Sequence, residues 1–67
     1  MDSIIKTWLN GLYDTAISET EAAIGNERIW QKGADNDDEI RLREENIARD
    51  EEYIQVLKRL KDDVNKM

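Results

Sequence analysis

Carboxylates are the most frequent reactive side chains of this sequence, and they concentrate in residues 35–52, which hold nine acidic and three basic residues. The alternation of Asp35 and Asp37 resembles the start of a calcium-binding loop. However, Ile40 stands where the sharp turn of such a loop needs glycine, and Asn46 stands where the loop needs a bidentate glutamate. We therefore expect no specific metal site.

No other pattern in the sequence predicts catalysis. The chain has no histidine, no cysteine, no glycine-rich phosphate loop and no nucleophilic serine motif. Two carboxylates could act as acid and base only in a dry pocket that separates their pKa values, and two helices cannot enclose such a pocket. The sequence predicts a non-enzymatic protein that uses no cofactor, no metal and no small-molecule substrate.

Charge and hydropathy narrow the classes of partner. The chain has 67 residues and a formal net charge of −6, which disfavours direct binding to nucleic acid or to an anionic membrane. Its longest apolar runs are far shorter than the roughly 20 residues that cross a bilayer. The first residues do not form the apolar segment of a secretory signal. We expect a cytoplasmic protein whose partners are proteins.

Two segments show the hydrophobic spacing of amphipathic helices. Apolar residues recur at steps of three and four over about residues 3–31 and again over about 37–66, with a loop over about 32–36. Helices joined by a short loop pack antiparallel. The predicted fold is an all-α, antiparallel two-helix hairpin that forms a single unit over residues 1–67.

Glycine and asparagine mark the predicted turn. Gly33 suits the left-handed position that often follows a helix, and Asn36 with Glu39 resembles a capping box for the second helix. At the start of the chain, Asp2 or Ser3 can cap the first helix. The two other glycines lie at positions 11 and 25, where each costs about 1 kcal/mol in a helix interior. They leave open whether the first helix is continuous.

Folding the chain back near residue 34 predicts which apolar residues form the core. The end that carries the two termini is richer in apolar residues, so we expect the stronger core there. Arg43 and Asp50 interrupt the seam near the loop. The predicted core residues are Leu9, Leu12, Ala16, Ala23, Trp30, Ile40, Ile47, Ile54, Leu57 and Val64.

A single hairpin cannot bury all of these apolar side chains. Ile4, Trp8, Leu60 and Met67 spread wider than one neighbouring helix can cover, which predicts assembly into a helical bundle, as an oligomer or with a partner. Tryptophan and tyrosine are also enriched among the residues that dominate interfaces.

Some carboxylates of the second helix lack an obvious local partner. Glu39–Arg43 and Glu45–Arg49 are spaced as favourable i,i+4 ion pairs. The remaining acids could form a rim for a basic surface, or simply the solvated face of a helix. The predicted partner-binding residues are Trp8, Tyr13, Glu44, Asp50, Glu51, Glu52, Tyr53 and Leu60.

The sequence thus predicts a small acidic protein-binding module that regulates or inhibits a larger protein. In size and composition it is analogous to small inhibitors from phages and mobile elements. Its partner would be a second copy of itself, or a larger protein with a basic or apolar surface. Two alternatives remain open: a nucleic-acid mimic that blocks a basic groove of a nucleic-acid-processing enzyme, and a structural coiled-coil element that only oligomerises.

Overall fold

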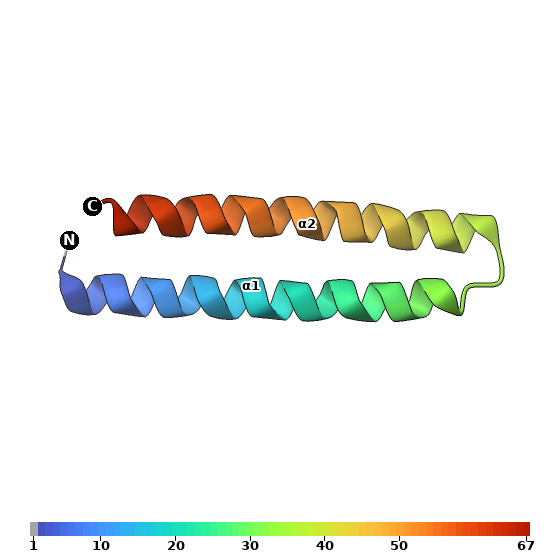
Figure 1. The fold of residues 1–67 in the computed structure, drawn as a ribbon, viewed down its shortest axis with the longest axis horizontal. Helices are drawn as coiled ribbons and strands as arrows, with labels where there is room; N and C mark the ends of the chain where they lie inside the picture. Colours follow the sequence, from blue (N-terminus) through green and yellow to red (C-terminus); the bar gives the residue numbers. More distant parts are fainter. Residues whose placement is uncertain (1) are drawn as a thin grey trace.

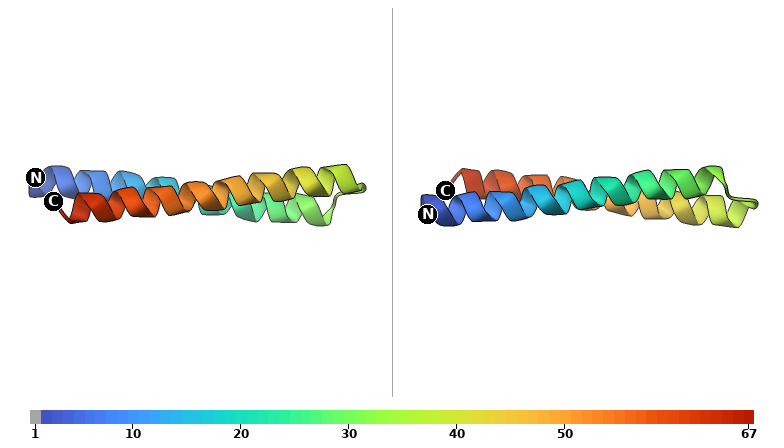
Figure 2. Two further views of the ribbon diagram at one scale, coloured as in Figure 1. Left: turned by 90° about the horizontal axis from the view of Figure 1, so that it is seen from above. Right: turned by 90° about the horizontal axis from the view of Figure 1, so that it is seen from below.

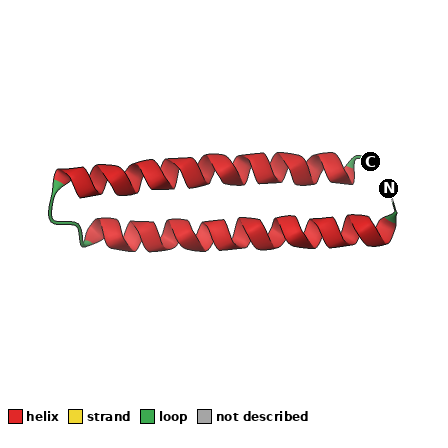
Figure 3. Ribbon diagram, turned by 180° about the vertical axis from the view of Figure 1, so that it is seen from behind, coloured by secondary structure: helices red, strands yellow, loops and turns green. Residues whose placement is uncertain are grey.

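The computed structural model describes residues 2–67 and consists of two long antiparallel helices (Figure 1). Helix α1 spans Ser3–Lys32 and helix α2 spans Asp37–Asn65. The connection between them is short, so the two termini lie at the same end of the molecule (Figure 1). No strand occurs among the described residues, and the predicted all-α hairpin is confirmed (Figure 3).

The hairpin is a thin rod. Its Cα atoms extend over 51 × 14 × 9 Å, and its radius of gyration is 15.5 Å, whereas a compact domain of this length has a radius of gyration of about 11 Å. The helices cross near the middle of the rod, as the views from above and below show (Figure 2). Each helix therefore has one neighbour only, and most of its circumference faces outward.

Side-chain caps fix where each helix begins. The Asp2 carboxylate accepts a hydrogen bond from the backbone N–H of Ile4 at 2.8 Å, so Asp2 is the N-cap of α1. The side-chain oxygen of Asn36 accepts one from the backbone N–H of Glu39, also at 2.8 Å. Both contacts satisfy amides that a helix leaves without partners in its first turn. Local hydrogen bonds therefore fix the residue at which each helix begins.

The predicted left-handed turn at Gly33 is wrong. Gly33 has φ −91° and ψ 1°, and no residue in the described part of the chain has positive φ. The last turn of α1 tightens instead: the Gly33 N–H donates to the Trp30 carbonyl at 3.1 Å, and the Ala34 N–H donates to the Gln31 carbonyl at 3.2 Å. These i→i−3 bonds redirect the chain within the right-handed region, so the turn does not require glycine.

The centre of the seam between the helices is its best-packed part. Ile24, Ile47 and Ile54 are buried and form one cluster, against which Ile17 packs. Toward the termini α2 also buries Leu57 and Val64.

Opposite those buried α2 residues, α1 contributes polar side chains. Asn10 and Asn65 exchange amide hydrogen bonds at 2.9 and 3.0 Å, and Lys61 donates to Asp14 at 2.5 Å. In the terminal half α2 therefore supplies the buried side chains, whereas Leu9, Tyr13 and Ile17 of α1 are only partly buried.

Three predicted core residues are exposed instead. Leu12, Ala23 and Trp30 face outward, and about half of the Leu12 and Trp30 surfaces is accessible. Ile47, Ile54, Leu57 and Val64 are buried as predicted, whereas Leu9, Ala16 and Ile40 are partly buried. The reason is that the seam of α1 follows a different stripe, which includes polar side chains. The residues of α1 on that stripe are Lys6, Asn10, Tyr13, Ile17, Thr20, Ile24, Glu27 and Gln31.

Helix α1 is continuous through both of its glycines, which yields a stability prediction. A Cβ atom added at Gly11 or Gly25 would meet nothing within 4 Å. Gly11→Ala and Gly25→Ala should each raise the free energy of unfolding by up to about 1 kcal/mol, because alanine loses less backbone entropy than glycine. Urea denaturation followed by circular dichroism, at fixed protein concentration, measures this.

Gly33→Ala tests the right-handed turn. At Gly33 an added Cβ would lie 3.8 Å from the Trp30 carbonyl oxygen, an ordinary contact, and the backbone is right-handed. We expect its free energy of unfolding to rise as well, by about 0.4–1 kcal/mol, whereas a left-handed Gly33 would lose stability on this substitution. A loss of stability in Gly11→Ala would contradict an exposed, continuous helix at that position.

Candidate protein-interaction surface

The seam divides the rod into two flanks of different chemistry. On one side, which we call the charged flank, Arg28 and Glu51 form an ion pair across the helices at 3.0 Å. On the other side, the Arg43 guanidinium lies over the Trp30 ring, 4.9 Å from its centroid. In an antiparallel pair, the residues that come directly before seam positions lie on the same side of the molecule in both helices. Trp30 comes directly before the seam residue Gln31, so it lies on that side.

Large apolar side chains gather on the Trp30 side, which we call the apolar flank. Among residues 2–67, eleven large hydrophobic residues are exposed: eight lie on this flank, Trp8 and Ile29 lie at its outer edge, and Ile4 lies beyond it. With its outer edge, the apolar flank comprises Ile5, Trp8, Leu9, Leu12, Ala16, Ala23, Ile29 and Trp30 of α1, together with Leu42, Tyr53, Val56, Leu60 and Met67 of α2. Single exposed apolar residues are ordinary, but a contiguous set marks an interaction site.

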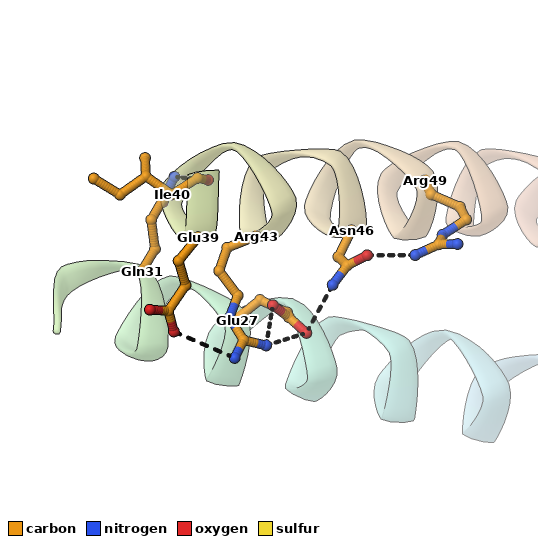
Figure 4. A network of polar contacts seen from close by, with 7 residues as sticks. All are labelled: Glu27, Gln31, Glu39, Ile40, Arg43, Asn46 and Arg49. Atoms are coloured by element: carbon orange, nitrogen blue, oxygen red, sulfur yellow. Dashed lines mark hydrogen bonds and ion pairs between the residues drawn. The ribbon is translucent and has the colours of Figure 1, made fainter. Parts of the chain in front are cut away.

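A polar network closes the seam near the loop (Figure 4). Arg43 contacts the Glu27 carboxylate at 3.2 Å and the Glu39 carboxylate at 3.7 Å. The Asn46 amide also reaches Glu27, at 3.5 Å, and in turn accepts a hydrogen bond from Arg49. The Glu27 side chain is only 13% exposed, so its negative charge depends on these donors.

The same network shapes the loop end of the apolar flank. An open hollow of about 480 Å³ lies there, lined by Ile29, Trp30, Gly33, Glu39 and Arg43. Arg43 holds Trp30 from one side, and its Nε atom is buried without a hydrogen-bond partner among the described residues. The hollow combines an apolar wall with the Arg43–Glu39 ion pair. It is suited to an aromatic or aliphatic side chain from another helix.

The predicted partner-binding residues do not form one surface. Only Trp8, Tyr53 and Leu60 lie together on the apolar flank, and all three are exposed. The other predicted residues are distributed elsewhere: Glu44 and Glu51 lie on the charged flank, Glu52 on the outer face of α2, and Tyr13 and Asp50 partly buried in the seam.

The structure adds to one expectation about the carboxylates of α2 and corrects another. Glu51 was expected to lack a local partner, and its partner is Arg28 on the other helix, α1. It also projects away from Tyr53, because two residues along a helix are about 200° apart. The predicted Glu39–Arg43 pair is present, but Arg49 contacts Asn46 and forms no ion pair with Glu45.

Charge is distributed unevenly along the rod. The loop half, residues 18–52, carries twelve acidic and five basic residues, whereas residues 2–17 and 53–67 carry four acidic and five basic ones. One end of the rod is therefore strongly negative and the other is close to neutral.

In the terminal half, a hydrogen bond from Lys66 to Asp62 at 3.0 Å raises the pKa of that lysine.

Sequence reasoning missed most of the apolar flank because it assigned apolar residues to the seam. Leu12 and Trp30 were placed in the core, and Ile29, Leu42 and Val56 were not singled out. The signal that could have found them is the width of the apolar arc of α1. Trp8, Leu9 and Leu12 cover a wider arc than one neighbouring helix can bury.

Comparison with known protein families, curated proteins and solved structures finds no match to this chain. In residues 2–67, neither helix has a stretch apolar and long enough to cross a membrane. The same residues bring together no group of three or more acidic side chains that could hold a metal ion.

The Arg43 network predicts unequal effects of two arginine substitutions. Arg43→Gln removes the main counter-charge of a mostly buried carboxylate, and should lower the free energy of unfolding by about 1–3 kcal/mol. Arg28→Gln breaks an ion pair whose two side chains are each more than half exposed, and should cost less than about 1 kcal/mol. Urea titrations of both variants measure the difference. Equal losses would contradict a special role for the Glu27 network.

Proposed function

We propose that this chain is a protein-binding module that works through its apolar flank. The observation that carries the proposal concerns the eleven large hydrophobic side chains exposed among residues 2–67: eight lie on one side of the rod, and Trp8 and Ile29 lie at its outer edge. A hairpin that functioned alone would gain nothing from this arrangement, because the exposed side chains contribute neither to the seam nor to solubility.

The two tryptophans supply a large share of the exposed apolar area that a partner would cover. Trp8 is 63% exposed and Trp30 is 52% exposed. Aromatic side chains bury about 150–250 Å² each, so covering either residue would contribute roughly 3 kcal/mol before the costs of association. Tryptophan and tyrosine often dominate the energy of an interface, and Tyr53 also lies on this flank. Trp8, Trp30 and Tyr53 would be the anchors.

A regulatory or inhibitory role fits such a module better than a chemical one. With a thin rod and open hollows, the chain acts by occupying a surface of its partner or by holding partners together. The nucleic-acid mimic has less support, because Glu51 is paired within the hairpin and Asp50 lies in the seam. The alternative of a purely structural coiled-coil element uses the same apolar flank, but only to join copies of this chain.

Site-specific photo-crosslinking tests the proposal. A photoreactive phenylalanine analogue replaces Leu12 or Leu60 on the apolar flank, or Ser18 or Gln55 on the opposite side, in cells that produce the protein. All four positions are exposed on continuous helices. We expect protein adducts from Leu12 and Leu60, and few from Ser18 and Gln55. Adducts mainly from Ser18 and Gln55 would contradict an apolar-flank interface.

A further inference from the structure

We infer that the apolar flank pairs with the apolar flank of a second copy of this chain. In this arrangement, two hairpins pack face to face about a two-fold axis perpendicular to the rod. The loop end of each hairpin then covers the terminal end of the other, and the four helices form one bundle. The inference rests on the proposed function, since it names the partner of the same surface.

The size of the flank suits such a dimer. The rod is 51 Å long and two helices wide, about 20 Å. One face therefore offers about 1,000 Å², and two copies together bury about 2,000 Å², within the range of stable specific interfaces. The free hairpin exposes 5057 Å², more than the roughly 4,400 Å² expected of a compact monomer of its mass. Pairing removes that excess.

Charge selects the antiparallel arrangement over the parallel one. The loop half has a net charge of seven negative units, twelve acids against five bases, and the terminal half has one positive unit, five bases against four acids. A parallel pair would place the two acidic loop ends side by side, where they repel each other. An antiparallel pair places each acidic end over the nearly neutral terminal end of the other copy, which removes this repulsion.

Side-chain sizes fit the same arrangement. A perpendicular axis near residue 18 of α1 places Leu12 of one copy opposite Ala23 of the other, because both lie about the same distance from the axis. It also brings Ile5 and Trp8 to the level of the Ile29–Trp30 hollow. Large residues thus meet small ones near the middle, and the tryptophan-bearing ends meet each other.

The mass of the purified protein tests the pairing. Sedimentation equilibrium at micromolar concentration should give twice the chain mass of 7.9 kDa. The double variant Leu12→Glu, Leu60→Glu should weaken dimerisation by at least 100-fold, since it places four carboxylates in the interface. The matched control, Ser18→Glu with Gln55→Glu, adds the same charges on the charged flank and should remain dimeric. Circular dichroism checks that the variants are helical.

The orientation is tested with one spin label. The chain has no cysteine, so Asp35→Cys in the loop provides a single labelling site. An antiparallel dimer places the two labels near opposite ends of the 51 Å rod, at about 50 Å, whereas a parallel dimer places them about 20 Å apart. Pulsed electron resonance distinguishes these distances. A short distance overturns the antiparallel arrangement.

The same measurements separate failure of this inference from failure of the proposed function. A monomeric wild-type chain whose Leu12 and Leu60 positions crosslink only to a heavier protein overturns self-pairing and leaves the proposed function intact. A monomeric chain whose apolar flank crosslinks to no protein overturns both. A dimer unaffected by Leu12→Glu with Leu60→Glu overturns the apolar flank as the self-pairing surface.

Discussion

One helix can cover only a single narrow stripe of its neighbour, and this limit governs the whole molecule. The apolar arc of α1 is wider than that stripe, so α2 buries Ile24 but leaves Leu12 and Trp30 outside. The same holds for α2, which buries Ile54 and exposes Tyr53. Because both surplus stripes fall on the same side of an antiparallel pair, they join into one surface. The apolar flank is thus a direct consequence of hairpin geometry.

The composition of the seam explains why the helices align as they do. An all-apolar seam can slide by a helical turn at small cost, but reciprocal amide bonds and ion pairs lose their partners when it slides. Asn10 with Asn65 fixes the register at one end, and Glu27 with Arg43 fixes it near the other. Such contacts stabilise a fold little more than apolar side chains of similar volume would, although removing one partner is costly. The seam therefore specifies one alignment.

The helices could be predicted from the sequence because their signals are local. The caps at Asp2 and Asn36 act within three residues, and the hydrophobic spacing repeats along each segment. The division into seam and flank could not be predicted, because it depends on which stripe of α1 meets α2. That choice involves polar contacts across the seam, such as Arg43 with Glu27, whose partners are 16 residues apart. Hydrophobicity alone favoured Leu12 over Tyr13 as a core residue. In the structure Tyr13 is partly buried in the seam and Leu12 is exposed.

The position of the buried cluster has a consequence for how the hairpin opens. Ile24, Ile47 and Ile54 form the buried cluster near mid-length. Toward the ends the seam is mixed: polar contacts lie beside buried Leu57 and Val64 in the terminal half, and around the mostly buried Glu27 near the loop. Local opening costs least where few apolar contacts must break. In the unpaired hairpin, amide hydrogens should therefore exchange with solvent fastest at the two ends and slowest around the cluster. The hairpin would therefore unfold locally from both ends toward its centre. The two helices would separate completely only when the contacts among the three clustered isoleucines break.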